Sequence, residues 1–327
     1  MRRQLVITTQ VYPVAGEFKI SRSTLTHIPV VMVEIHDGAY VGRGECRPYK
    51  RYNQTVESVT EEIESVRSEI ESGISKEALQ RALPANASRN ALDCALWDFE
   101  AKKMGKAVWE LLGLDKPKAR ETAYTLSINT PDEMAAKAVE AAQHKTLKLK
   151  IGNISGLDAC LAILEARPDA QLIIDANEAL NPDELKQVQN ELSDHPIIFI
   201  EQPLPADIET SFNPQQQPII CADEALHTVD DLPRLWSQGY RAINVKLDKC
   251  GGLSSGYQLL KTGKAMGFKT MAGCMVGSSL AMAPMMMLES LADVIDLDGP
   301  LLLKEDIDKG LTYKNGKVWP PIPALWG

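Results

Sequence analysis

The sequence predicts an α/β protein, a modified (β/α)8 TIM-type barrel with an N-terminal α+β capping domain, and three observations carry this prediction. Residues 1 to about 60 have strand and turn character and are followed by a helical stretch. From residue 121, apolar strands alternate with polar loops and helical segments in eight units. Reactive side chains end almost every one of these strands, which is where a parallel barrel carries its functional groups.

Residues 1–118 are expected to form the capping domain. The apolar runs LVITTQVYPV and VVMVEI, the Asp37-Gly38 dipeptide and the run AYVGRGE predict antiparallel strands with a hairpin turn. The stretch 89–105 has helical periodicity and ends at Gly105. Its apolar stripe consists of Ala91, Leu92, Ala95, Leu96 and Phe99.

The barrel is expected over residues 119–300. Its strand cores are AYTLSI, LKLKIG, LIIDAN, IIFIEQ, IICADE, INVKLD, TMAGCM and VIDLDG, and residues that mark successive strands recur every 22 to 27 positions from Lys148 to Asp296. A doubly wound open sheet uses the same units, but reactive residues on almost every strand suit a closed ring better than a single crevice. Residues 301–327 lack a helical pattern and are expected to return to the cap.

Composition narrows the class of protein. A hydrophobic content of 44% and a charged content of 24% are ordinary for a globular chain of 327 residues. The net charge of −9 without a basic block argues against nucleic acid or an anionic membrane as partner. Without a signal-like apolar run we expect a cytoplasmic protein. Six scattered cysteines indicate reduced thiols, and five dispersed histidines give little support to a zinc site.

Three consecutive strands end in a carboxylate: Asp175, Glu201 and Asp223. On neighbouring barrel strands these groups would crowd together, which is tolerable only around a cation. Oxygen ligands without His or Cys select a hard ion, and Mg²⁺ is the natural choice. The alternative is that each acid caps the helix that follows it, which is common for one Asp but less so for three acids in register.

Two lysines share one face of the second strand, because side chains alternate along a strand: Lys148 and Lys150 in the segment KLKIG. Lys246 lies on the sixth strand, across the ring from the second. Lys150 and Lys246 would therefore flank a metal-bound substrate from opposite sides. Burial beside another cation lowers a lysine pKa, so Lys148 could turn Lys150 into a usable base. The alternative is an ion-pair network that merely balances the acids.

The eighth strand carries Asp296 and Asp298 on one face. Because this strand lies opposite the fourth, the pair is expected to be far from the metal edge and free to bind a substrate ammonium. A helix cap with a surface charge is the alternative. The glycine pair in KCGGLSSG could form a phosphate loop, although tight packing explains it equally well, and AMAPMMMLE is interpreted as core.

These residues together resemble the enolase superfamily in its muconate-lactonizing subgroup. The segments KLK at 148–150, DAN at 175–177, EQP at 201–203, ADE at 222–224 and the Lys246 strand are similar to that family's KxK, metal-ligand and lysine positions, and the resemblance covers nearly the whole chain. IDLDGP is similar to the strand-8 DxD of the dipeptide epimerases. GECRPYKRY, ICADEALHT, KLDKCGGL and AGCMVGSS also resemble that branch.

The resemblance implies a Mg²⁺-dependent epimerase that inverts the α-carbon of the C-terminal residue of a dipeptide, L-Ala-D/L-Glu or a related one, through an enediolate. Lys150 and Lys246 would exchange the proton. The substrate would be contacted by Lys148, Thr125, Cys274, Asp296, Asp298 and Arg22. Leu25 departs from the pattern of Glu-specific members, which carry another cation in this loop.

Three rival functions remain open at this point. An o-succinylbenzoate synthase or a cycloisomerase of the same subgroup could use the same metal and lysines, but its substrate has no ammonium for the aspartate pair. A Schiff-base aldolase could use Lys246 as nucleophile. A non-catalytic binding module has no need of a base on each side of a metal. The side chains of the dipeptide, the lysine that serves each enantiomer and the assembly of a homo-oligomer are not fixed by the sequence.

Overall fold

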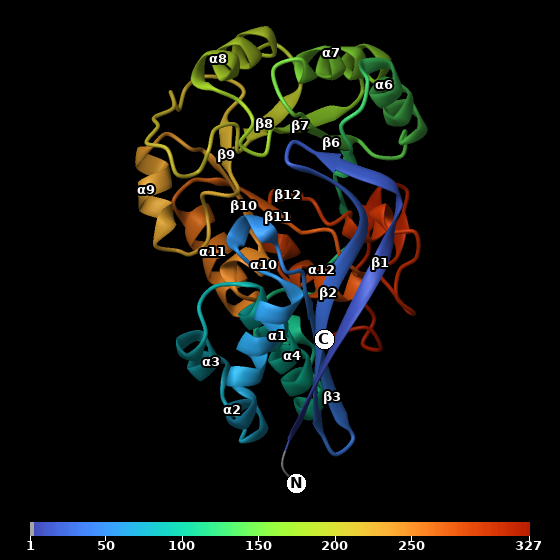
Figure 1. Ribbon diagram of the computed structural model, residues 1–327, viewed down its shortest axis with the longest axis vertical. Helices are drawn as coiled ribbons and strands as arrows, with labels where there is room; N and C mark the ends of the chain where they lie inside the picture. The colour runs from blue at the N-terminus through green and yellow to red at the C-terminus, as the bar shows by residue number, and fades with distance from the viewer. Residues whose placement is uncertain (1–2) are drawn as a thin grey trace.

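The computed structural model describes residues 3–327, and a sheet of eight parallel strands confirms the predicted barrel (Figure 1). The strands are neighbours in chain order, and the backbone N–H of Ala123, just before the first strand, donates to the carbonyl of Ile295 on the last, 2.8 Å away. The two ends of the sheet therefore meet. The strands are β5 (Tyr124–Leu126), β6 (Thr146–Lys150), β7 (Gln171–Asp175), β8 (Ile197–Glu201), β9 (Ile220–Ala222), β10 (Ala242–Lys246), β11 (Lys269–Gly273) and β12 (Val294–Ile295).

Helices surround this sheet, with one departure from the predicted repeat. No helix forms in residues 202–219, between β8 and β9. Four prolines in this segment explain the departure, because each removes a backbone donor. The helices of the barrel domain are α6 (Pro131–Glu140), α7 (Gly156–Ala166), α8 (Pro182–Glu191), α9 (Asp231–Ser237), α10 (Leu247–Cys250), α11 (Leu253–Ala265) and α12 (Ser279–Met286).

The cap consists of an antiparallel sheet and a helical layer. Its strands are β1 (Gln4–Ile20), β2 (Ser23–Asp37) and β3 (Tyr40–Cys46), and the turn between β2 and β3 confirms the hairpin predicted at Asp37-Gly38. The helix predicted over 89–105 is α4 (Ala87–Met104), which ends at Gly105 with a φ of 64°. Shorter helices complete the layer: α1 (Val56–Ser65), α2 (Arg67–Glu71), α3 (Lys76–Ala82) and α5 (Val108–Leu111).

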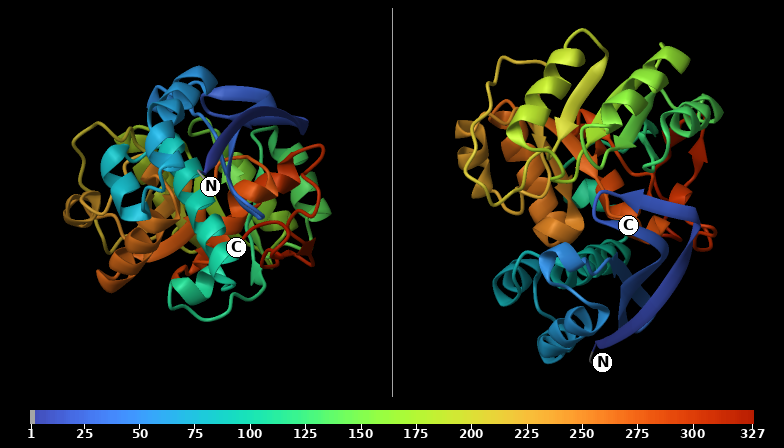
Figure 2. Two further views of the ribbon diagram at one scale, coloured as in Figure 1. Left: turned by 90° about the horizontal axis from the view of Figure 1, so that it is seen from below. Right: turned by 45° about the horizontal axis from the view of Figure 1, so that its top comes forward.

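The hairpin of β1 and β2 extends beyond the cap and reaches the barrel (Figures 1 and 2). At its tip, the backbone N–H of Lys19 donates to Ser127 after β5, and the Ser21 hydroxyl donates to the carbonyl of Asn177 after β7. These contacts lie at the carboxyl ends of the strands. The cap therefore covers the end of the barrel where function is expected.

The C-terminal segment contacts both domains. A hairpin of β13 (Tyr313–Lys314) and β14 (Lys317–Val318) pairs with β4 (Arg120–Glu121). Further along, the indole of Trp326 donates to the carbonyl of Arg43 at 2.9 Å, and the backbone N–H of Gly327 donates to Asp98 at 2.7 Å. Across residues 3–327, the structure contains no helix whose length and apolar character would suit a membrane crossing.

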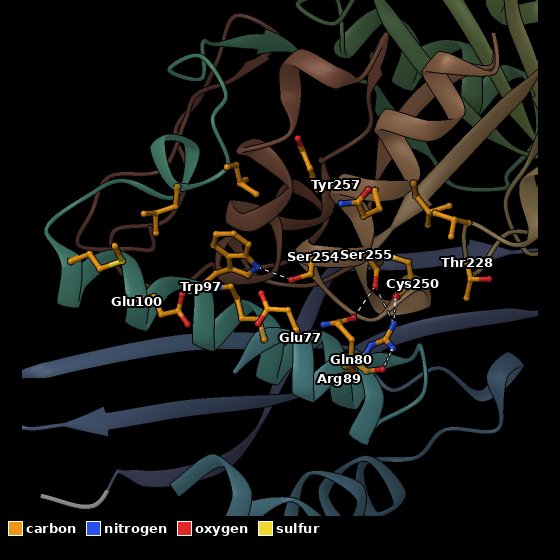
Figure 3. Close-up of a pocket in the computed structure, with 17 residues that line it drawn as sticks. Glu77, Gln80, Arg89, Trp97, Glu100, Thr228, Cys250, Ser254, Ser255 and Tyr257 are labelled. Atoms are coloured by element: carbon orange, nitrogen blue, oxygen red, sulfur yellow. Dashed lines mark hydrogen bonds and ion pairs between the residues drawn. The ribbon is translucent and has the colours of Figure 1, made fainter. Parts of the chain in front are cut away.

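A polar junction joins the cap to the barrel between α4 and α11 (Figure 3). Arg89 of α4 is buried and donates five hydrogen bonds, and Asp93 accepts from Gln80 and Ser254. A Cβ atom on Gly252 would lie 2.5 Å from Asp93. Close packing therefore explains the glycine pair. This is one of the two interpretations that the sequence allowed for KCGGLSSG. The acceptors of Arg89 are the carbonyls of Gln80, Leu83, Cys250 and Gly251 and the hydroxyl of Ser255.

A cavity of about 750 Å³ opens beside this junction, lined in part by Trp97 and Tyr257. It lies away from the acids and lysines singled out in the sequence. The methionine-rich segment also belongs to the structural part of the molecule, as predicted, because its methionines are buried in the main core: Met282, Met285, Met286 and Met287.

Candidate active site

The three predicted metal-binding acids lie together inside the barrel. Asp175 ends β7 and Glu201 ends β8 at the same level of the ladder, and Asp223 follows β9. Each offers a carboxylate oxygen within 4.8 Å of the others, and each is at most 2% exposed. We call Asp175, Glu201 and Asp223 the acidic trio. Their shared level follows from parallel pairing, which brings the carboxyl ends of neighbouring strands to one edge.

The two lysines of β6 point into the barrel, while Leu147 and Leu149 face the core outside the sheet. Lys150 Nζ lies 2.5 Å from Asp175 Oδ2, and Lys148 Nζ lies 3.2 Å from the same atom. The carboxylate thus separates two ammonium groups that would otherwise repel each other. Two ammonium groups on one face of a strand need an anion between them, and Asp175 provides it.

Lys246 approaches the acidic trio from the other side. Its Nζ atom lies 2.7 Å from Asp223 Oδ2 and 4.0 Å from Glu201 Oε1. Glu201 lies between the strands that carry Lys150 and Lys246, as the strand order shows. Lys150 and Lys246 thus lie on strands to either side of the strand of Glu201, and their placement on opposite sides of a substrate stays a prediction.

A fourth lysine, Lys249, completes the surroundings of Asp223 and was missed by sequence reasoning. It is 2% exposed, and its Nζ atom lies 2.5 Å from Asp223 Oδ1 while also donating to the carbonyl of Asp223 and to that of Asn244. Lys249 lies in α10, three residues after Lys246. Lys246 ends β10, so the available signal was a second lysine in the short segment that directly follows this strand.

Charge and burial act against each other in the trio. Burial favours the neutral acid, but Lys150 and Lys148 outweigh it and lower the pKa of Asp175 to about 2. Glu201 behaves in the opposite way: burial and the neighbouring Asp175 raise its pKa to about 8. Burial opposes the charge of Lys246 as well, yet attraction by Asp223 raises the pKa of this lysine above its ordinary value. A divalent cation among the carboxylates would weaken that attraction.

The trio suits Mg²⁺. All three donors are hard carboxylate oxygens, buried and close enough to converge on one ion. Three acids in such proximity repel one another, and this repulsion adds to burial in raising the pKa of Glu201. Glu201 is further held by Asn244, whose side-chain N–H donates to Oε1 at 2.7 Å. The residues present therefore fit the ion that the sequence predicted.

The aspartates of the eighth strand lie closer to the trio than predicted. Lys148 Nζ lies 2.8 Å from Asp296 Oδ2 and 2.8 Å from Glu201 Oε2, so one lysine joins the two acids. The expectation that the pair is far from the metal edge was wrong, because the barrel interior is narrow enough for a single side chain to span it. Asp298 accepts the backbone N–H of Thr125 at 2.6 Å, and burial with Asp296 raises its pKa to about 7.

One cavity, which we call the active-site pocket, brings most of the predicted residues together. Its lining includes every residue predicted for the site except Asp175 and Glu201: Arg22, Thr125, Lys148, Lys150, Asp223, Lys246, Cys274, Asp296 and Asp298. Its volume is only about 50 Å³. The tip of the β1–β2 hairpin contributes Phe18, Ile20, Arg22 and Leu25 to the lining.

Arg22 holds the hairpin tip in place. Its guanidinium donates to Glu224 at 2.7 Å, to Glu178 at 2.6 Å and to the carbonyl of Asn177 at 2.8 Å. Arg51 contacts Glu178 from the cap as well, at 2.8 Å. The predicted contact of Arg22 with substrate stays a prediction, and in this structure its donors are directed to protein acceptors.

A further arginine, Arg47, lines the pocket and was not singled out from the sequence. It follows β3 and is 6% exposed. The segment GECRPYKRY that contains it was noted, but nothing in the segment indicates that this arginine is buried in the pocket.

Comparisons with known proteins agree with the geometry. Residues 132–323 match the family described as Enolase C-terminal domain-like, and residues 2–113 match the N-terminal domain of the mandelate racemase / muconate lactonizing enzyme family. The chain is 38% identical to an L-Ala-D/L-Glu epimerase of Escherichia coli over 319 residues, which cover 97% of this chain and 99% of that one.

Two solved structures are similar as well. An enolase family member from Agrobacterium tumefaciens with homology to dipeptide epimerases, bound to sodium and L-Ala-L-Glu, is 43% identical with a TM-score of 0.94, over 99% of this chain and 100% of that one. A dipeptide epimerase from Methylococcus capsulatus, complexed with Mg and L-Arg-D-Lys, is 26% identical with a TM-score of 0.90, over 100% and 99%. The chain belongs to the enolase superfamily, in the muconate-lactonizing branch that contains the dipeptide epimerases.

Proposed function

We propose that the protein is a Mg²⁺-dependent dipeptide epimerase, which inverts the α-carbon of the C-terminal residue of its substrate. The observation that carries this proposal is the approach of Lys150 and Lys246 to the acidic trio from two flanks, at 2.5 Å from Asp175 and 2.7 Å from Asp223. Inversion needs an acid and a base on opposite faces of one carbon. The relatives that epimerise dipeptides support the same activity.

The metal and the lysines divide the chemistry. Held by Asp175, Glu201 and Asp223, Mg²⁺ would place positive charge beside the substrate carboxylate and so acidify the adjacent α-proton. One lysine, as the free amine, takes that proton, and the electrons of the C–H bond move into the carboxylate to give an enediolate. The ammonium of the other lysine returns a proton to the opposite face. The two lysines then recover their original protonation by exchange with solvent.

Asp296 and Asp298 are assigned to the N-terminal ammonium of the dipeptide. Both are buried in the pocket, and Asp296 Oδ1 has no hydrogen-bond partner among residues 3–327. A buried carboxylate oxygen without a partner is costly unless a ligand supplies a donor. An o-succinylbenzoate synthase or a cycloisomerase acts on substrates without an ammonium, so this pair favours the epimerase.

Proton exchange in D₂O tests the proposal directly. With Mg²⁺ present, the enzyme is expected to introduce deuterium at the C-terminal Cα of an L-Ala dipeptide and to convert either epimer into a mixture, followed by mass spectrometry and NMR across a dipeptide library. EDTA should abolish the reaction and added Mg²⁺ restore it. Activity that survives EDTA, with borohydride trapping of a carbonyl substrate on the chain, would instead identify a Schiff-base aldolase.

A further inference from the structure

Arg47 is a buried cation in the active-site pocket. The residue is 6% exposed and lines the active-site pocket, and its backbone N–H donates to Asp248 Oδ1 at 3.0 Å. Within residues 3–327, the guanidinium takes part in no hydrogen bond and no ion pair. Its nearest ring is that of Tyr49, 5.5 Å from the guanidinium carbon. The backbone is thus anchored while the charged end is left unpaired.

An unpaired guanidinium in such a place is unfavourable. It carries five N–H donors, and a charged group that is largely withdrawn from water without a paired anion costs free energy. Burial lowers the pKa of Arg47, against a partial opposing effect of Tyr49 and Asp248. Buried charges in proteins are otherwise paired, so this side chain is expected to meet an anion that the protein itself does not provide.

The other cations of the pocket are engaged by protein carboxylates. Arg22 donates to Glu178 and Glu224, and Lys148, Lys150 and Lys246 contact the acidic trio. Arg47 therefore differs from these four cations. It also comes from the cap, whereas the acids and lysines that would act on the α-carbon come from barrel strands. A cap residue is suited to contact the substrate away from the reacting carbon.

Resting on the proposed function, we propose that Arg47 selects dipeptides whose epimerised C-terminal residue carries a carboxylate side chain. The fork of the guanidinium binds that carboxylate through paired hydrogen bonds. Phe18, Leu25 and Val276 line the same pocket, so part of its wall is apolar. In this assignment Arg47 supplies the positive charge that Leu25 does not. A neutral side chain would leave the guanidinium unpaired and is selected against.

The test compares two substrates of nearly equal shape, L-Ala-L-Glu and L-Ala-L-Gln, with the Mg²⁺-loaded enzyme. The wild type should prefer L-Ala-L-Glu in kcat/KM for Cα deuterium exchange. Arg47→Met should lower kcat/KM for L-Ala-L-Glu by about 30-fold or more, with a much smaller fall for L-Ala-L-Gln. Arg47→Lys should recover part of the preference, because it restores the charge but not the fork.

Arg89→Met is the matched control, since it removes an equally buried arginine outside the pocket. It should leave the ratio of the two substrates unchanged. An equal fall for both substrates in Arg47→Met would overturn the selective role and show that Arg47 is structural.

If Arg47→Met does not fold, the substrate preference of the wild type tests the role of Arg47. Faster exchange of L-Ala-L-Gln or L-Ala-L-Met than of L-Ala-L-Glu overturns the role of Arg47 while the proposed function stands. Absence of exchange with every dipeptide overturns the proposed function and this inference with it. A preference for L-Ala-L-Glu of at least tenfold supports both.

Discussion

Two buried arginines of this protein have opposite surroundings. Arg89, at the cap–barrel junction, is 7% exposed and donates five hydrogen bonds, four of them to backbone carbonyls (Figure 3). Arg47, in the active-site pocket, is 6% exposed and donates none from its side chain to residues 3–327. Burial and residue type are the same, so the difference lies in the acceptors that the protein supplies to each guanidinium.

The buried acids repeat the contrast. Asp93 at the junction accepts from Gln80 and Ser254, whereas the acidic trio holds three carboxylates together beside the lysines that we propose for proton transfer. Polar networks that stabilise a fold are completed by the protein. A network that binds a ligand lacks some of its partners in the free protein. The free energy that this costs is recovered when the metal and the substrate bind. Incomplete pairing at high burial is therefore what we expect of the proposed active site.

The largest loss of activity is expected from a substitution among the lysines around the acidic trio. Lys246→Met removes one of the two proton-transfer groups, and epimerisation should fall by about 10³-fold or more. Deuterium exchange at Cα should persist for one epimer, because Lys150 still reaches its face. Chiral chromatography measures the inversion and NMR the exchange. Lys264→Met, at an exposed lysine, is the control. Retention of inversion within tenfold would contradict the two-lysine assignment.

A substitution in the hydrogen-bond network of the cap–barrel junction should instead lower stability. Arg89→Met leaves five acceptors without their donor, and the free energy of unfolding is expected to fall by about 3 kcal/mol. Urea denaturation followed by circular dichroism measures this. The KM for substrate and the affinity for Mg²⁺ should stay as in the wild type. A change in either, with little loss of stability, would show that the junction is not purely structural.

The same contrast explains what the sequence could predict. Asp175, Glu201 and Asp223 were predicted because each acid follows its own apolar strand, and parallel pairing brings strand ends together. Lys249 was also within reach, since it lies in the short segment that directly follows the strand of Lys246. The missing helix between β8 and β9 could have been inferred from four prolines in residues 202–219.

Other features depend on distances across the barrel and between domains. The contact of Lys148 with both Asp296 and Glu201 follows from the width of the barrel interior, which no local pattern encodes. The burial of Arg47 arises because a strand end of the cap is packed against α10. Its lack of partners is a property of the assembled pocket and not of the segment GECRPYKRY.

Glu45 is an intermediate case. Both of its carboxylate oxygens accept hydrogen bonds, but within the described residues its charge is not balanced by a cation. It accepts the backbone N–H of Ser278 at 2.8 Å and the hydroxyl of the same residue, while no cation among residues 3–327 forms an ion pair with it. Burial raises its pKa to about 7, with Asp248 and Asp306 adding to the effect. Its folded pKa lies above the unfolded value of 4.5, so this contribution to stability is present below pH 4.5 and is lost as pH rises to 7.

Glu45→Gln should therefore be more stable than the wild type at pH 8 and similar to it near pH 4.5. At about 1.4 kcal/mol per pKa unit, the gain at pH 8 amounts to at most about 3 kcal/mol. Thermal unfolding of both proteins between pH 5 and pH 8 measures the difference, and Glu17→Gln at an exposed position is the control. Parallel curves for variant and wild type would contradict the charge imbalance assigned to Glu45.

The smallest expected effect concerns Lys249. All the partners of its ammonium are supplied by the protein, yet one of them is a member of the acidic trio. Three acceptors surround its ammonium, and one of them is Asp223 Oδ1, so it fixes the carboxylate with Oδ2 toward Lys246. Residues that orient a metal ligand typically change metal affinity by 10- to 100-fold when replaced. Lys249→Met should weaken Mn²⁺ binding, measured by electron paramagnetic resonance, within about that range, because Asp223 becomes free to rotate. Lys264→Met should bind Mn²⁺ as the wild type does. Tighter binding by Lys249→Met would instead mean that the lysine mainly competes with the ion for Asp223, since removal of a positive charge alone favours a cation.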